Sequence, residues 1–95
     1  MRTTNLTFPI VHLNGTSGSY LKVAYEEAGY ALAEALEHLR QTAPHGRDYY
    51  VSKDPEALAK ATAEYTARVE KLSEMIEDMA ELSAAVRQQI DARKR

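Results

Sequence analysis

The sequence contains no cysteine and no tryptophan, and it has few glycines and prolines. The absence of cysteine excludes disulfide bonds, thiolate catalysis and sulfur-ligated metals. No apolar run approaches the roughly 20 residues that span a bilayer. The N-terminus leads into a short apolar patch that lacks the core of a signal peptide. We therefore expect a cytoplasmic protein that does not enter a membrane.

The chain also lacks a strong charge of either sign. Its 95 residues carry a net charge of -2, and this length is that of one domain. General nucleic-acid binders are usually basic, so nucleic acid is a disfavoured partner. A chain this short buries a modest fraction of its surface, and two helices that cover only one side of each other bury still less. We therefore expect self-association into a dimer or a higher homo-oligomer.

Apolar residues near the N-terminus gather around Pro9. Their run is too short for a helix, and the proline discourages one. Residues 1–15 are therefore predicted to form an extended arm, with a lone strand lying on helical surface as the alternative for its apolar part. The pair Asn14-Gly15 then signals a turn, after which Thr16 or Ser17 can cap a helix.

A first amphipathic helix is predicted over residues 18–42. Its apolar residues are spaced alternately by four and three positions, which is the repeat of a coiled coil or a helical bundle. Several of these residues are alanines, which allow a partner backbone to approach closely. The predicted stripe consists of Leu21, Tyr25, Ala28, Leu32, Ala35 and Leu39.

Pro44 ends the first helix and opens a tip loop over residues 43–54. Asp54 suits the N-cap of a second helix over residues 55–92, and Pro55 suits its first position. At about 1.5 Å per residue this helix is about 57 Å long against about 37 Å for the first, so we expect its C-terminal third to overhang. That third would pack on the arm, on another chain or on both. The second stripe consists of Leu58, Thr62, Tyr65, Val69, Leu72, Ile76, Met79, Ser83, Val86 and Ile90.

These elements predict an all-α fold, a long antiparallel helical hairpin with an extended N-terminal arm that assembles into an oligomeric helical bundle. Met75 and Leu82 widen the second stripe enough to touch more than one neighbour. A run of acidic residues is expected opposite this stripe as solvated surface, with docking of a basic partner as the alternative. The run consists of Glu70, Glu74, Glu77, Asp78 and Glu81.

The tip loop carries more chemistry than a helix connection requires. Arg47 offers a fork to a phosphate or a carboxylate, and a tyrosine can stack on a base. The alternative is a structural loop in which Arg47 pairs with Asp48 and Gly46 supplies an unusual backbone angle. The candidate ligand-binding residues of the loop are His45, Arg47, Tyr49 and Tyr50.

The start of the first helix is the second candidate segment. Free N–H groups at a helix start bind anions, and here small residues, hydroxyls and a lysine accompany them. The alternative is a simple capping segment. A site that used both segments would cross a subunit interface, because one helix separates them by about 35 to 40 Å. The candidates of this segment are Asn14, Thr16, Ser17 and Lys22.

Catalysis has no comparable signal. His12, His38 and His45 lack a metal-ligand spacing such as His-x-x-x-His. A Ser–His–Asp set could be assembled only by assuming a fold. We therefore expect a protein that is not an enzyme and that has neither a cofactor nor a metal.

Two stretches, from His12 to Ser17 and from Pro44 to Tyr50, resemble segments of a group of small proteins of tailed phages and prophages. Small helical oligomers of phages include anti-defence proteins that sequester the cyclic nucleotide signals of bacterial immunity (anti-CBASS and anti-Thoeris proteins). The chain resembles these in size, helical hairpin and basic tip. The resemblance implies a non-enzymatic sponge in the host cytoplasm that holds a phosphorylated, cyclic nucleotide at an intersubunit site. The alternative is a protein-interaction module, either an inhibitor of a host protein or a virion assembly factor, that acts through its helical surface.

Overall fold

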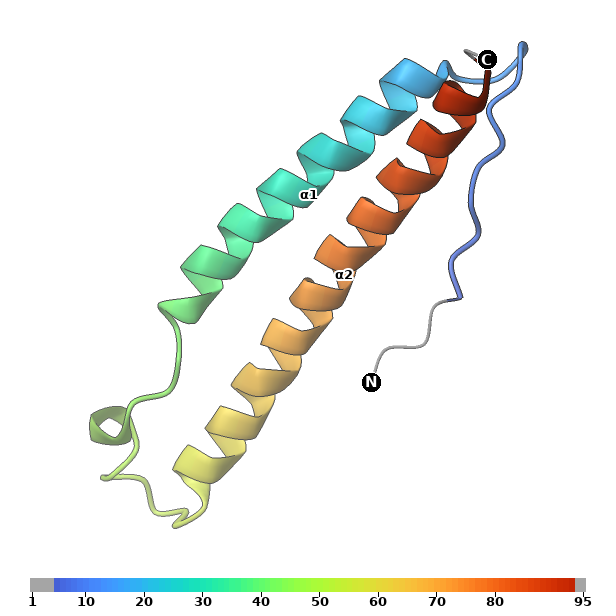
Figure 1. Ribbon diagram of the computed structural model, residues 1–95. Helices are drawn as coiled ribbons and strands as arrows, with labels where there is room; N and C mark the ends of the chain where they lie inside the picture. Colours follow the sequence, from blue (N-terminus) through green and yellow to red (C-terminus); the bar gives the residue numbers. More distant parts are fainter. Residues whose placement is uncertain (1–4, 94–95) are drawn as a thin grey trace.

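The computed structural model describes residues 5–93 and is a hairpin of two long helices (Figure 1). Helix α1 spans Gly18–Arg40 and helix α2 spans Ala57–Arg93. The loop between them contains one 3-10 turn, η1, at Gly46–Asp48. The helices run antiparallel, and the part of the chain that the structure describes contains no strand. The predicted all-helical hairpin is confirmed.

Local sequence sets where α1 begins and ends. The Oγ of Ser17 accepts the N–H of Tyr20 at 3.1 Å, which satisfies one of the free donors of the first turn. The helix ends at Arg40, two residues before the predicted boundary. There the hydroxyl of Thr42 donates to the carbonyl of Leu39 at 2.7 Å, and Pro44 follows in an extended stretch. Ser17 is therefore the N-cap of α1, as one of the two residues predicted for that role.

A glycine fixes the register between the helices. A Cβ at Gly18 would lie 2.9 Å from Cγ1 of Ile90, so only glycine lets the start of α1 approach the end of α2 this closely. Because α1 begins beside the end of α2, the longer helix extends past α1 at the opposite end. The prediction that the C-terminal third of α2 overhangs is therefore wrong. The overhang is at the N-terminal end of α2, beside the tip loop (Figure 1).

The contact stripe of α1 differs from the prediction in its last turns. Leu36 is half-buried and Ala35 is exposed, so the larger residue takes the position predicted for the alanine. Both residues fit a three-or-four spacing from Leu32, and the isobutyl group of Leu36 buries more apolar surface. In its last turns, the contact stripe of α1 therefore uses Leu36, one residue after the predicted Ala35.

The first two turns of α2 differ in the same way. Leu58 and Thr62 are exposed, while Ala57 and Ala61 are half-buried. This part of α2 extends past the end of α1 and lies beside the tip loop, so it has no helix to pack against. Met75, predicted to widen the stripe, is also exposed.

The arm runs beside the C-terminal half of α2, parallel to it and on the side away from α1 (Figure 1). The side-chain amide of Gln89 holds it at two points: Oε1 accepts the N–H of Val11 at 2.8 Å, and Nε2 donates to the carbonyl of Pro9 at 2.8 Å. The guanidinium of Arg93 also donates to the carbonyl of Val11. Residues 5–12 have no regular secondary structure. Residues 1–4 of the predicted arm lie outside the part of the chain that the structure describes.

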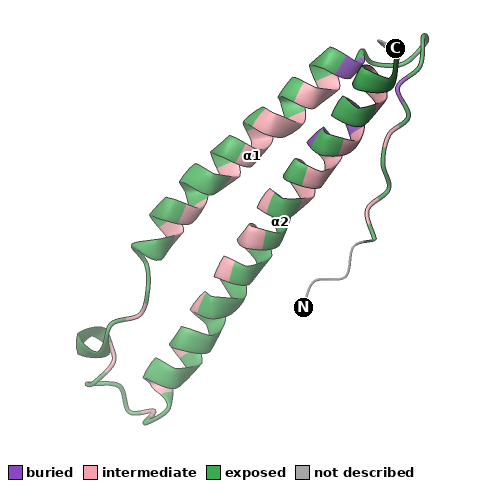
Figure 2. Ribbon diagram, viewed as in Figure 1, coloured by how far each residue is buried: buried purple, intermediate pink, exposed green. Residues whose placement is uncertain are grey.

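The buried residues gather where the arm and the two helices meet (Figure 2). Val86 is fully enclosed, and Val11, Gly18 and Ser83 are buried around it. The molecule is elongated, 64 × 23 × 20 Å, and its radius of gyration is 19.2 Å. A compact domain of this length has a radius of about 12 Å. The hairpin therefore has a small core at one end and a long exposed body.

The acidic run of α2 is not wholly the solvated surface that its sequence predicts. Asp78 and Glu81 are half-buried, whereas Glu70, Glu74 and Glu77 are exposed. The arm lies along α2 on the side away from α1, which is the side on which half-buried residues of α2 occur in addition to its contact stripe. Packing of the arm accounts for this burial.

Candidate functional site

The tip loop forms a shallow cavity of about 500 Å³ at the far end of the hairpin. Its backbone is held locally: Nδ1 of His45 accepts the N–H of Arg47 at 3.1 Å, and the N–H groups of Tyr49 and Tyr50 both donate to the carbonyl of Gly46 at 3.0 Å. Tyr50 is 79 % exposed, and Tyr49 is half-buried. The loop therefore brings Arg47, Tyr49 and Tyr50 to the wall of one cavity, with His45 in a supporting position.

The guanidinium of Arg47 has no hydrogen bond or ion pair to any described residue. The pairing with Asp48 expected of a purely structural loop is therefore not formed within residues 5–93. Gly46 does not supply an unusual backbone angle either, since no residue in that range has a positive φ. Arg47 is thus available to an anionic group from outside the chain.

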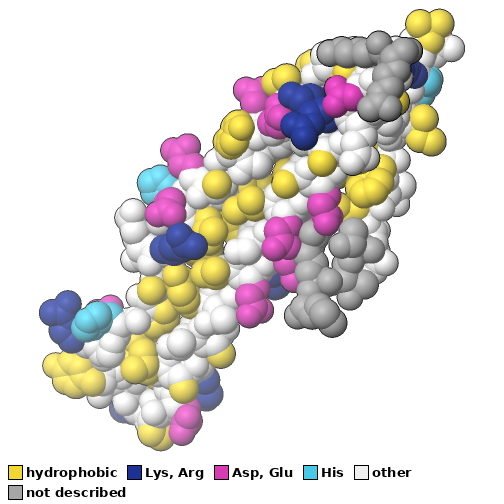
Figure 3. Space-filling view, in the orientation of Figure 1, with side chains coloured by type: hydrophobic (Ala, Val, Ile, Leu, Met, Phe, Trp, Pro, Cys, Tyr) yellow, Lys and Arg dark blue, Asp and Glu magenta, His cyan; other side chains and the backbone are white. Residues whose placement is uncertain are grey.

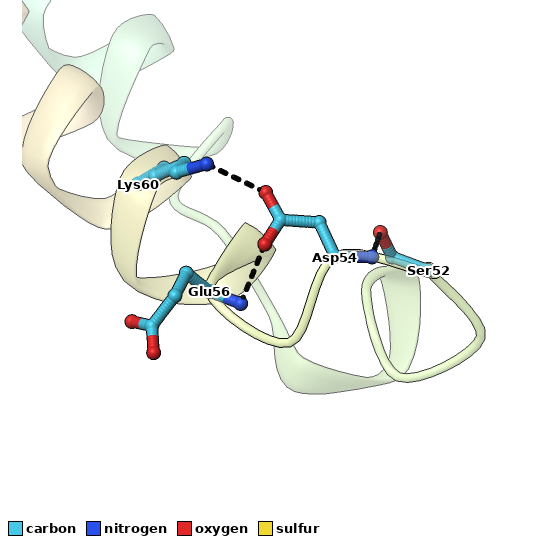
Figure 4. Close-up of polar contacts among 4 residues, drawn as sticks. All are labelled: Ser52, Asp54, Glu56 and Lys60. Atoms are coloured by element: carbon cyan, nitrogen blue, oxygen red, sulfur yellow. Dashed lines mark hydrogen bonds and ion pairs between the residues drawn. The ribbon is translucent and has the colours of Figure 1, made fainter.

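Asp54 is the structural centre of the loop's second half (Figure 4). Its Oδ1 accepts the N–H of Glu56 at 2.9 Å, its Oδ2 binds the ammonium of Lys60 at 2.7 Å, and its own N–H donates to Oγ of Ser52 at 3.1 Å. The Lys60 ammonium first, and the Glu56 N–H second, hold the pKa of Asp54 below its ordinary value of 3.8. Asp54 therefore holds the turn at Pro55 and Glu56 that leads into α2, which begins at Ala57, two residues after the predicted start. Its negative charge lies beside the tip cavity that it helps to line.

The second predicted segment is less open than the first. The ammonium of Lys22 lies 3.2 Å from both carboxylate oxygens of Glu26, one turn later on α1. Ser17 uses its hydroxyl as the cap of the helix. Asn14 and Thr16 are exposed in the turn that precedes the helix. Ser17 therefore has the capping role of the alternative interpretation. Lys22 could bind an anion only if its ion pair with Glu26 were broken.

The two predicted segments lie at opposite ends of the hairpin, as their positions in the sequence require (Figure 1). The 23 residues of α1 separate them, a rise of about 35 Å. Within one chain no ligand of nucleotide size contacts both. A joint site would need a second subunit.

A third surface was not singled out from the sequence. A groove of about 410 Å³ runs along the junction of α1 and α2. Its floor and walls are mostly small or apolar, and two charged residues, Glu26 and Arg87, lie at its end near the arm junction. Figure 3 shows hydrophobic side chains along the helix junction on the face in view. The sequence signal for the groove was the set of small residues beside the stripes, Gly29, Ala33, Ala80 and Ala84.

The structure contains no metal-binding cluster of histidine and carboxylate side chains among residues 5–93. Neither helix, over the same residues, offers a stretch long and apolar enough to cross a bilayer. The described surface offers an apolar groove, a cavity lined by Arg47, and exposed tyrosines.

The fold and its surfaces define an elongated helical hairpin with an open apolar face. No family model, curated protein or solved structure matches this chain. The arguments for its function therefore come from its own geometry.

Proposed function

We propose that the chain is a non-enzymatic protein-interaction module that acts through the open face of its helical hairpin. The observation that carries this proposal is the exposed surface. The chain exposes 7367 Å², whereas a compact monomer of 10.6 kDa exposes about 5,500 Å². A hairpin that buries so little against itself is stabilised by surface that it buries against a partner.

The groove between the helices is the part of this surface best suited to a protein. It is apolar and open, and small residues at its walls allow a partner helix to approach closely. Tyr30 and Val23 stand beside it on α1, 74 % and 47 % exposed, and tyrosine is enriched where proteins meet. An apolar patch of this kind on a small protein marks an interaction site.

A photo-crosslinking amino acid in place of Tyr30 tests this proposal in the cells that produce the protein. We expect a crosslinked product from position 30 and none from position 31, which is two residues from both Gly29 and Ala33 and so lies about 160° around α1 from the groove wall. Mass spectrometry then identifies the protein on the other side of the crosslink. The absence of any product at position 30 would contradict an interaction through this face.

The tip cavity favours a second candidate, which is the sequestering of a phosphorylated nucleotide without turnover. Arg47, free of partners within the described chain, would bind the phosphate, and Tyr49 or Tyr50 would stack on the base. The charge of Asp54 at the cavity and the pairing of Lys22 with Glu26 count against this reading. In a phage such a protein would act against host immunity, as the sequence resemblance implies.

Thermal stability in the presence of cyclic di- and trinucleotides and ADP-ribose derivatives tests the second candidate. A ligand at a hundredfold excess over its Kd stabilises the folded state by about 2.7 kcal/mol. We expect Arg47→Ala to abolish this shift and Lys53→Ala, a matched change in the same loop, to retain it. A panel without any shift would contradict nucleotide binding and leave the interaction module intact.

A further inference from the structure

We infer that the occupant of the groove is a second copy of this chain, packed face to face and antiparallel to the first in a two-fold dimer. The inference rests on the proposed function, because it takes the open face of the hairpin to be an interaction surface. It adds the identity of the partner, its orientation and the residues at the symmetry axis.

The amount of exposed surface argues for a second copy. The chain exposes about 1,900 Å² more than a compact monomer of its mass. A stable dimer buries about 800 Å² on each partner, well within that excess. Every copy carries the same excess and the same groove, and a two-fold axis covers both grooves at once because each partner contributes the same patch.

The groove also has the shape that a self-complementary contact needs. Gly29 and Ala33 on α1, with Ala80 and Ala84 on α2, leave its walls low. Tyr30 rises beside them and is 74 % exposed. A small-residue surface next to a large projecting side chain allows each copy to insert its tyrosine beside the partner's alanines.

The position of the groove sets the axis. Gly29 lies in the groove and is also the middle residue of α1, which spans Gly18–Arg40. An axis that crosses the helices here places Tyr30 of each copy next to Tyr30 of the other. It also places each α1 antiparallel to the α1 of the partner, so Gly18 of one copy lies level with Arg40 of the other.

The charges at the two ends of the groove favour this orientation. Arg87 and Glu26 lie at the end near the arm junction, where Glu26 is paired with Lys22. Toward the other end, Glu37 is paired with Arg40 on α1, and Glu70 precedes Ala84 by two seven-residue repeats on α2. An antiparallel pair sets Arg87 of each copy toward Glu70 of the other, whereas a pair with both tips at one end sets the two arginines at the same level.

The dimer brings the two predicted ligand segments to the same end of the assembly. In one chain, the turn that contains Ser17 and the tip loop that contains Arg47 lie at opposite ends of α1. In the antiparallel dimer, the Ser17 turn of one copy lies beside Arg40 of the other, where the tip loop begins. Each end of the dimer then carries both segments, one from each copy.

Single cysteines test the arrangement, because the natural chain contains none. We expect Tyr30→Cys to form a disulfide-linked dimer in a mild redox buffer. A mixture of Val23→Cys and Glu37→Cys chains should form the mixed disulfide, while neither variant alone links to itself. The control is Ala31→Cys, on the opposite side of α1, which should remain unlinked. A dimer that formed none of these links would overturn the antiparallel arrangement.

Light scattering on the natural chain tests whether the partner is a second copy of the chain. We expect twice the 10.6 kDa of one chain. Ala33→Glu, which adds a charge to the exposed wall of the groove, should raise the dimer dissociation constant at least about tenfold. Ala31→Glu, the same change on the opposite face, should not. Both alanines are exposed in the single chain, so neither variant is expected to unfold it.

The outcomes separate this inference from the proposed function. A monomeric natural chain whose position 30 crosslinks to a different protein overturns the second copy and keeps the interaction module. A dimer that Ala33→Glu leaves intact overturns the groove as its interface. A monomer that crosslinks to nothing overturns both.

Discussion

The arm junction and the tip loop are held together by different kinds of contact. At the junction, the hydrogen bonds that join Pro9 and Val11 with α2 connect residues 78 to 82 positions apart, and the side chain of Val86 on α2 is fully enclosed. At the tip, the side-chain hydrogen bonds join residues two to six positions apart, and none of residues 41–56 is buried. Contacts that stabilise the fold are therefore concentrated at the arm junction, whereas the tip loop carries exposed polar and aromatic side chains.

Removing the core side chain gives the largest expected difference between the two ends. Val86→Ala deletes two enclosed methyl groups and should lower the free energy of unfolding by about 2 to 3 kcal/mol. Val51→Ala, the same change at an exposed position of the tip, should change it by less than about 0.5 kcal/mol. Urea denaturation at equal protein concentrations measures both. If both variants lost the same unfolding free energy, stability would not be concentrated at the arm junction.

Releasing the arm should have a smaller effect. Gln89→Ala removes both hydrogen bonds of the amide to Pro9 and Val11 and should cost about 1 to 2 kcal/mol of unfolding free energy. The backbone amide of Val11 should then exchange with solvent faster, which hydrogen-exchange mass spectrometry detects. Gln88→Ala is the matched control, because Gln88 is exposed and no hydrogen bond joins it to the described part of the arm. Unchanged exchange at Val11 would show that Gln89 does not hold the arm.

The smallest expected effect is a pH dependence at the tip. The folded state lowers the pKa of Asp54, so its carboxylate stabilises the fold above the ordinary pKa of about 3.8, and that contribution is lost as pH falls through the lower folded value. Asp54→Asn keeps an oxygen for the Glu56 N–H but loses the ion pair with Lys60. We expect the melting temperature of the natural chain to fall more steeply below about pH 4 than that of the variant. Parallel curves would show that this ion pair does not contribute.

The hairpin could be predicted from the sequence because its signals are local. The repeat of apolar residues requires helices, Pro44 separates them, and Ser17 and Asp54 carry the side chains that cap them. Local signals of this kind depend on residues within one or two turns of each other. For the tip, the sequence left two alternatives open, pairing of Arg47 with Asp48 or availability of Arg47 to a ligand, and the pair with Asp48 is not formed within residues 5–93.

The register could not be predicted, because it depends on one distant contact. Gly18 is small enough for Ile90 to pack on it, and this contact decides which end of α2 extends past α1. The periodicity also does not decide whether Ala35 or Leu36 faces α2, since both fit a repeat of three or four residues. The groove was missed for a related reason: small residues on a helix become a groove only when the partner helix is placed.

The arm gives the chain an unusual order of assembly. A ribosome makes Pro9 and Val11 78 to 82 residues before the Gln89 and Arg93 side chains that hold them. At about 5 to 20 residues per second, the arm waits roughly 4 to 16 seconds for these partners. During that time the arm has no partner in its own chain, and it can meet neighbouring chains on the same messenger first.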